Sequence, residues 1–246
     1  TPDDIMKDYL ERMAQESGHA SEATKVNGNT PVAVTKVSVP FFVSLPFTDK
    51  NGESVKDIYS SIKTGATLVI IPKKMFSRTA NLLDYLCDNN VTTLIWAVSA
   101  LCLITTFHGL DYKVPEKINK ILFSGEVMPI KHIKEWIEHL PNATYVNLYG
   151  PTEITCNCTY HIVEKKLEYE KQIPVGKAFD NEQVFLLDEE NKLITDNEKI
   201  GEICVKGTAL ALGYYRDKKQ TEDKFIQNPL NDRYIDMIYK TGDMGY

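Results

Sequence analysis

The central part of the chain alternates between short β-branched runs and stretches whose apolar residues recur every three or four positions. The first pattern is typical of buried strands, and the second is typical of helices that pack on one side. Strands are expected at residues 67–71, 92–96, 120–124 and 144–148, and helices at residues 57–63, 79–87, 99–107 and 131–140. Such alternation favours right-handed βαβ units around a mostly parallel sheet. We therefore predict an α/β fold of the flavodoxin-like type, with helices flanking the sheet.

Other patterns precede and follow this part. Toward the C-terminus the helical spacing gives way to β-rich pieces at residues 183–187 and 200–205, separated by polar turns. At the N-terminus we expect a helix with an apolar face formed by Ile5, Met6, Tyr9, Leu10 and Met13. A polar linker is expected to follow this helix. The chain is therefore divided into a helix and linker of unknown origin over residues 1–40, an α/β subdomain over residues 41–165 and a smaller β-rich subdomain over residues 166–246.

Composition and charge argue against several classes of protein. The chain has 246 residues, of which 43% are hydrophobic and 25% charged, and this balance fits a globular protein. Its net charge of -6, without a dense stripe of Lys and Arg, argues against a nucleic-acid-binding surface. No apolar run approaches the roughly 20 residues needed to cross a bilayer, and the first residues lack the features of a signal peptide. The five cysteines contain no C-x-x-C pair, so a cytoplasmic location without disulfides or zinc is expected.

Loops with polar residues and glycine follow several of the expected strands. In a parallel sheet the carboxyl ends of the strands lie at one edge, where ligands bind. The loops in question are residues 97–98, 125–127 and 149–153. The last of them carries Tyr149, Thr152 and Glu153 around a Gly-Pro turn. One loop can therefore offer a stacking face, a hydroxyl for a phosphate and a carboxylate for Mg²⁺, and we expect a nucleotide site at this edge.

Each of these residue types also has an ordinary structural explanation. Thr152 can cap a helical turn, and Glu153 can be a first-turn acid that the helix dipole favours. Tyr149 can pack on the edge of the sheet, and Glu126 can be a solvated acid. Asp243, farther along the chain, can occupy a simple Gly-Asp turn. Taken one at a time, the residues leave these alternatives open.

Several segments occur in one fixed order: ILFSGEV at residues 121–127, NLYGPTE at 147–153, GEICVKG at 201–207, LGYY at 212–215 and YKTGD at 239–243. In sequence and order they resemble the motifs of the adenylation domains of nonribosomal peptide synthetases, which are adenylate-forming enzymes. The resemblance runs from about Val55 to the last residue. It implies that ATP and Mg²⁺ activate a carboxylic acid, with an amino acid expected, to an acyl-adenylate and pyrophosphate. Transfer to the phosphopantetheine thiol of a peptidyl or acyl carrier protein would follow.

The resemblance also implies a role for particular residues. Thr152 would hydrogen-bond the α-phosphate, Glu153 would hold Mg²⁺ and Asp243 would take the ribose hydroxyls. Tyr149 would lie against the adenine. The other nucleotide-binding residues implied are Gly125, Glu126, Val127, Asn147 and Gly150. The acyl pocket implied has Trp96, Leu122, Ser124, Leu148 and Cys156 around the side chain of the acid, with Glu53 and Lys56 at its front.

The chain departs from the family's pattern in three places. Gly52 stands where the family has the Asp that pairs with the amino group of the substrate; Glu53 and Asp49 are the alternative partners, and Asn51-Gly52 reads equally as a tight turn. The family's Gly-rich phosphate loop is absent from the sequence, and the chain stops at Tyr246, just after the ribose motif. We therefore expect a central fragment, a shortened form or a degenerate relative, whose activity alone is in question. The alternatives are a catalytically inactive nucleotide-binding or carrier-docking module, and a flavodoxin-like nucleotide-binding scaffold without ligase ancestry.

Overall fold

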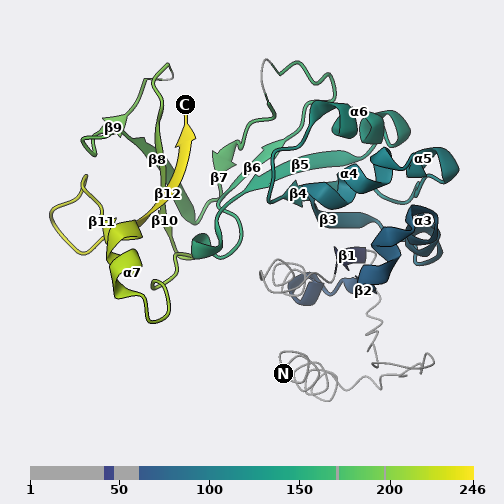
Figure 1. Ribbon diagram of the computed structural model, residues 1–246, viewed down its shortest axis with the longest axis horizontal. Coiled ribbons are helices and arrows are strands. Elements are labelled where there is room, and N and C mark those ends of the chain that lie inside the picture. Colours follow the sequence, from purple (N-terminus) through teal and green to yellow (C-terminus); the bar gives the residue numbers. More distant parts are fainter. Residues whose placement is uncertain (1–41, 47–60, 170–171, 197) are drawn as a thin grey trace.

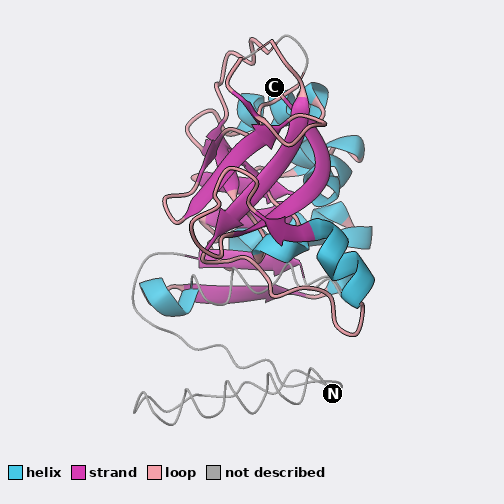
Figure 2. Ribbon diagram, turned by 90° about the vertical axis from the view of Figure 1, so that its left-hand side faces the viewer, coloured by secondary structure: helices cyan, strands magenta, loops and turns pink. Residues whose placement is uncertain are grey.

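The computed structural model describes residues 42–46, 61–169, 172–196 and 198–246. Within these residues the chain forms two sheets, a larger one flanked by helices and a smaller one that carries the C-terminus (Figures 1 and 2). The expected N-terminal helix and linker lie outside the described residues. So do Glu53, Lys56 and the segment around Gly52.

The larger sheet has seven strands in the order β2-β1-β3-β4-β5-β6-β7. Strands β1 to β5 pair in parallel, and β6 and β7 extend the sheet in the antiparallel direction. The order of the parallel strands is that of flavodoxin-like folds, so the predicted fold class is confirmed. The strands are β1 (Phe42–Pro46), β2 (Thr67–Ile71), β3 (Thr93–Ala97), β4 (Lys120–Ser124), β5 (Thr144–Tyr149), β6 (Thr159–Ile162) and β7 (Lys177–Ala178).

Helices α3, α4, α5 and α6 lie together on one side of this sheet (Figure 1). The helices of the larger subdomain are η1 (Lys73–Ser77), α3 (Thr79–Asp88), α4 (Val98–Thr106), α5 (Gly109–Tyr112) and α6 (Ile130–His139). Their apolar sides and the strands form one core, in which buried polar groups join neighbouring elements; the indole N–H of Trp96 is the exception, because it has no partner among the described residues. The indole of Trp136 donates to the carbonyl of Leu101 at 3.2 Å, and the hydroxyl of Tyr145 donates to the carbonyl of Trp136 at 2.7 Å. The core therefore ties α4, α6 and β5 together.

Adjacent residues of a strand point to opposite faces of the sheet. Trp96 and Phe123, which are paired between β3 and β4, belong to the core on the helix side. Ile95 and Leu122, the pair next to them, line a cavity on the other side. The central sheet thus separates a packed face from a face that carries a cavity.

The smaller sheet has five antiparallel strands in the order β11-β12-β10-β8-β9. Its elements are β8 (Glu182–Leu187), β9 (Leu193–Ile194), β10 (Gly201–Gly207), α7 (Lys218–Lys224), β11 (Phe225–Gln227) and β12 (Met237–Gly245). The Asp188 side chain stabilises the turn between β8 and β9, because its carboxylate accepts hydrogen bonds from the backbone N–H groups of Glu190 and Lys192. This sheet lies within the range that the sequence assigned to a β-rich subdomain.

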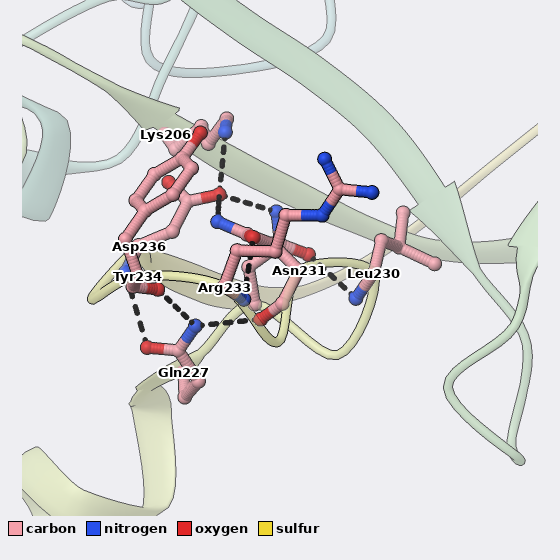
Figure 3. A network of polar contacts seen from close by, with 8 residues as sticks. Lys206, Gln227, Leu230, Asn231, Arg233, Tyr234 and Asp236 are labelled. Carbon is pink, nitrogen blue, oxygen red and sulfur yellow. Dashed lines mark hydrogen bonds and ion pairs between the residues drawn. The ribbon is translucent and has the colours of Figure 1, made fainter.

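A polar network holds the loop between β11 and β12 (Figure 3). The Asp236 carboxylate accepts from the Lys206 ammonium at 2.7 Å and from the Asn228 amide at 2.8 Å. The hydrogen bond from Lys206 is the main cause that lowers the pKa of Asp236. The carboxylate therefore stays ionised and joins the loop to β10.

The boundaries of the elements differ slightly from those expected. The strand expected at residues 92–96 is β3 at Thr93–Ala97, and the helix expected at 99–107 is α4 at Val98–Thr106. Of the helix expected at 57–63, only residues 61–64 are described, and they are helical. The short antiparallel strand β6 follows the loop after β5 and was not expected.

Candidate functional site

The loop after β5 is built to hold a fixed shape. A Cβ added at Gly150 would lie 2.4 Å from the Cα of Asn157, so only glycine fits this position. The backbone N–H of Cys158 closes the loop on the carbonyl of Tyr149 at 2.8 Å. Inside the loop, the one-turn helix η2 (Thr152–Ile154) is anchored by the fully buried Ile154. The turn therefore presents an exposed Thr152 and a partly buried Glu153 at the carboxyl end of β5.

The smaller sheet meets this loop through hydrogen bonds that bring distant motifs together. The Tyr149 hydroxyl donates to the Asp243 carboxylate at 2.6 Å, although the two residues are 94 positions apart. The backbone N–H of Ala211 donates to the carbonyl of Glu153 at 2.8 Å, and the Thr155 hydroxyl donates to the carbonyl of Ala209 at 2.7 Å. The residues to which the resemblance assigned adenine, phosphate, metal and ribose thus lie around one junction between the sheets.

Asp243 is held in place by its neighbours in β12. Its backbone N–H donates to the Thr241 hydroxyl at 3.0 Å, and that hydroxyl in turn donates to the carbonyl of Ile203 at 2.8 Å. The N–H of Gly242, which has a positive φ of 83°, donates to the Glu202 carboxylate at 3.0 Å. The Asp243 side chain itself is exposed, so its carboxylate faces solvent beside Tyr149.

Tyr149 has both a structural and a candidate binding role. Its ring packs against the cluster formed by Ile154, Cys158, Ile203 and Val205, as the ordinary structural explanation requires. Burial, followed by the hydrogen bond to Asp243, raises the pKa of its hydroxyl well above the ordinary value. The phenol therefore stays protonated and remains a hydrogen-bond donor, while the ring is only partly buried.

The other expected nucleotide-binding residues fall into two groups. Gly125, Glu126 and Val127 are exposed directly after β4, which is the parallel neighbour of β5, so they lie at the same edge as Tyr149. Asn147 is buried instead, and its amide donates to the carbonyl of Pro174 at 2.9 Å. The structure thus uses the Asn147 side chain to hold the segment before β7.

A cavity of about 600 Å³ lies beside the loop after β5. Of the residues expected in the acyl pocket, Leu122, Leu148 and Cys156 line it. The other lining residues are Ile95, Val146, Thr155, Asn157, Tyr160, Phe179, Asp180 and Asn181. The wall is mainly apolar, and Tyr160 and Phe179 stack within it at 5.2 Å between ring centroids. A few polar groups also line it, as in sites that bind small ligands.

Trp96 is not among the residues that line this cavity. It is 2% exposed and packs edge-on against Phe76 at 5.3 Å, within the core on the helix side. The physical reason is the period of two in a strand, which directs Ile95 to the cavity and its neighbour away from it. Ser124 is buried at the end of β4 and shares the side of Leu122, but it lies outside the lining residues.

Two features of the site could not be read from the motifs. Tyr214 donates its hydroxyl to the Glu153 carboxylate, although only a turn was expected at the glycines near it. Ile95, Tyr160 and Phe179 line the cavity without belonging to any motif. The alternation of β3 was the available signal for Ile95. The contact of Tyr214 had no signal, because it joins two separate sheets.

The side chains that could bind a metal ion or act as a nucleophile limit the chemistry of the site. Across the described ranges, no group of three or more His, Cys, Asp and Glu side chains could hold a metal ion. A single carboxylate such as Glu153 fits Mg²⁺, which is commonly held by one or two carboxylates together with substrate phosphates. None of the five cysteines forms a disulfide, and burial raises the pKa of Cys158 to about 12 and that of Cys204 to about 11. These two thiols are therefore protonated and are not poised as nucleophiles.

Comparisons with known proteins agree with one another. The family described as AMP-binding enzyme matches residues 43–215. Bacitracin synthase 1 of Bacillus licheniformis is 31% identical over 191 residues, which cover 78% of this chain and 4% of that protein. The D-alanine–D-alanyl carrier protein ligase of Bacillus cereus is 35% identical over 198 residues, covering 78% of this chain and 37% of that protein. The chain therefore spans little more than a third of the shorter of these relatives.

Solved structures show the same fold. The crystal structure of CmiS6 has a TM-score of 0.76 at 24% identity, covering 83% of this chain and 49% of that chain. The Vibrio cholerae adenylation domain AlmE, solved in complex with glycyl-adenosine-5'-phosphate, has a TM-score of 0.72 at 23% identity, covering 83% of this chain and 38% of that chain. Among the helices of the described residues, none is both long and apolar enough to cross a membrane.

Proposed function

Because the chain belongs to the AMP-binding enzyme family, we propose that its site serves the activation of a carboxylic acid with ATP and Mg²⁺. The product would be an acyl-adenylate, and the acyl group would pass to the phosphopantetheine thiol of a carrier protein. The observation that carries the proposal is the junction at which Tyr149, Thr152, Glu153 and Asp243 meet beside an apolar cavity. A nucleotide at the junction and an acid in the cavity would be neighbours.

The proposed reaction is the attack of a carboxylate oxygen on the α-phosphorus of ATP. The new O–P bond replaces the bond to the leaving pyrophosphate, and negative charge gathers at the phosphorus oxygens. Positioning and electrostatics dominate catalysis of this kind. Thr152 would donate to the α-phosphate, and Glu153 would hold the Mg²⁺, which offsets charge when bound. Tyr149 would carry the adenine and Asp243 the ribose.

The cavity favours an acid with a small or medium apolar side chain. Ile95, Leu122 and Leu148 are apolar lining residues, and Asp180 and Asn181 are polar ones. An amino acid is the proposed substrate class. Two similar proteins support this class. One is named as a D-alanine–D-alanyl carrier protein ligase, and the other, AlmE, was solved in complex with glycyl-adenosine-5'-phosphate.

Non-hydrolysable acyl-adenylate analogues test the proposal most simply, because they occupy both halves of the site without needing the phosphates of ATP. We expect at least one aminoacyl-sulfamoyl-adenosine from a set covering the common amino acids to bind tenfold or more tighter than AMP, which is about 1.4 kcal/mol. Leu122→Trp, which fills the cavity, should abolish that advantage and leave AMP binding unchanged. Isothermal titration calorimetry gives both affinities.

The alternative is a catalytically inactive nucleotide-binding or carrier-docking module. If AMP binds as tightly as every acyl analogue, the acyl half of the proposal is wrong and the nucleotide-binding module stands. If neither AMP nor any analogue binds, the proposal and the nucleotide-binding module both fail, and only the carrier-docking module is left.

A further inference from the structure

Tyr214 reaches the carboxylate that is the proposed Mg²⁺ ligand. Its hydroxyl donates to Oε1 of Glu153 at 2.5 Å, from a position 61 residues farther along the chain. The same segment also holds the backbone of Glu153, because the N–H of Ala211 donates to its carbonyl at 2.8 Å. Residues 211–214 therefore hydrogen-bond both the main chain and the side chain of Glu153.

The position of the Tyr214 hydroxyl is fixed by its surroundings. The backbone N–H of Tyr214 donates to the Thr221 hydroxyl at 2.9 Å, and Gly213 has a φ of +132°. A Cβ at Gly213 would lie 2.4 Å from a methyl carbon of Thr221, so the approach of this segment to α7 requires glycine. The backbone position of Tyr214 relative to α7 is therefore fixed.

An aromatic group supports the ring. Tyr214 packs edge-on against Phe225 at 5.6 Å, and Phe225 packs against Tyr239 at 5.0 Å. The Tyr239 hydroxyl lies 3.3 Å from that of Tyr214, so a second phenol stands behind the first. The Tyr214 hydroxyl is the donor in its contact with the Glu153 carboxylate.

A neutral donor suits a metal-binding carboxylate. Without a partner, a glutamate on a one-turn helix would lose its side-chain entropy only when the metal binds, and that ordering lowers affinity. A Lys or Arg partner would fix the side chain but would also repel Mg²⁺. A phenol fixes one carboxylate oxygen and adds no charge.

We propose that Tyr214 is a positioning residue for Glu153, holding the carboxylate in the orientation in which it binds the Mg²⁺ of a nucleotide. The inference rests on the proposed function, since it takes Glu153 as the metal ligand. Partners that orient metal ligands typically change metal affinity by about tenfold or more when they are removed.

The test compares Tyr214→Phe with Glu153→Gln and with the double variant in the whole chain. Tyr214→Phe keeps the ring and its packing on Phe225 and removes only the hydroxyl. Tyr215→Phe is the matched control, because the neighbouring side chain is 86% exposed and contacts Arg216 rather than Glu153. For each protein, ATP binding is measured by calorimetry across a series of Mg²⁺ concentrations, and adenosine binding is measured without metal.

We expect Tyr214→Phe to raise the half-saturating Mg²⁺ concentration about tenfold while leaving adenosine binding and the melting temperature unchanged. Tyr215→Phe should change nothing. In the Glu153→Gln background, Tyr214→Phe should have no further effect, because a positioning residue acts only through its partner.

The outcomes separate this inference from the proposed function. If Glu153→Gln shifts the Mg²⁺ dependence and Tyr214→Phe does not, the positioning role is wrong and the metal ligand stands. Equal shifts from Tyr214→Phe with and without the Glu153 carboxylate would also overturn it, since the hydroxyl would then act by another route. If Glu153→Gln has no effect, or the wild-type chain shows no Mg²⁺-dependent binding of ATP, both claims fail.

Discussion

Glu182 is a buried carboxylate at the start of β8, beside the segment that reaches the candidate site. It is 5% exposed, and its Oε1 accepts the Asn181 amide at 2.7 Å and the Ala209 N–H at 3.2 Å. Its Oε2 has no hydrogen-bond partner among the described residues. Burial is the main cause that raises the pKa of this carboxyl above the ordinary value of 4.5, and the N–H of Ala209 opposes the shift. Folding therefore shifts this carboxyl toward its protonated form relative to the unfolded chain.

This burial predicts a pH dependence of stability. Because the folded protein holds the Glu182 proton more tightly than the unfolded chain, the stabilising contribution is complete below the ordinary pKa of 4.5 and is lost as pH rises through the raised, folded-state value. Glu182→Gln cannot ionise, and its amide oxygen can still accept from Asn181 and Ala209. We therefore expect the variant to gain stability relative to the wild type as pH rises from 4 to 8.

Thermal unfolding of both proteins at closely spaced pH values measures this difference. Glu190→Gln, at an exposed acid in the turn after β8, is the control and should not change the profile. A constant difference in melting temperature between Glu182→Gln and the wild type across the pH range would show that the buried carboxylate does not titrate between the two states.

At the scale of elements, strand β3 determines what lines the cavity. Its hydrophobic pattern predicted a strand, but the observed strand begins and ends one residue later than expected. That offset does not change the face on which each side chain lies, because alternation along the strand sets the face of each residue. The resemblance placed Trp96 in the acyl pocket, whereas the structure places Trp96 in the core and its neighbour Ile95 at the cavity.

Ile95 and Trp96 form a matched pair that tests the two faces of β3. Trp96→Ala removes a fully packed core side chain and should cost about 3–5 kcal/mol of unfolding free energy. Ile95→Ala enlarges the cavity wall and should cost less, while shifting the preference among acyl-adenosine analogues toward larger acyl groups. Urea unfolding and calorimetry measure the two effects. A larger change in acyl preference from Trp96→Ala than from Ile95→Ala would place the acyl group on the other face.

At the scale of the whole molecule, the order of elements was predictable and the contacts between the sheets were not. Period and β-branched content located the parallel strands β2 to β5 to within about a residue, because both reflect burial along the chain itself, but β1 at Phe42–Pro46 was not expected. The motifs indicated which loops meet, as Tyr149 and Asp243 do at 2.6 Å. No local pattern could indicate that the Asn147 amide would hold Pro174, or that Tyr214 would reach Glu153, since both contacts join residues that are far apart in the sequence.

The packing between the sheets also explains why the candidate site sits where it does. The loop after β5 and strand β12 are joined by the bond between Tyr149 and Asp243, and the segment 207–214 fills the space beside them. A ligand bound at this junction would contact both subdomains. The central claim is therefore that the junction is a nucleotide site, in which Asp243 binds the ribose.

Calorimetric titration of AMP into the wild-type chain and into Asp243→Ala tests that claim most directly. Asp232→Ala is the control, because Asp232 is an exposed acid in the loop between β11 and β12. We expect the wild type and Asp232→Ala to bind AMP equally, with ATP within about tenfold of AMP because the sequence has no Gly-rich phosphate loop. Asp243→Ala should lose about 1.5–3 kcal/mol of binding free energy, the usual worth of a hydrogen bond to a charged group. Equal AMP affinity in Asp243→Ala and the wild type, or no saturable binding to the wild type, would contradict the assignment of this junction as a nucleotide site.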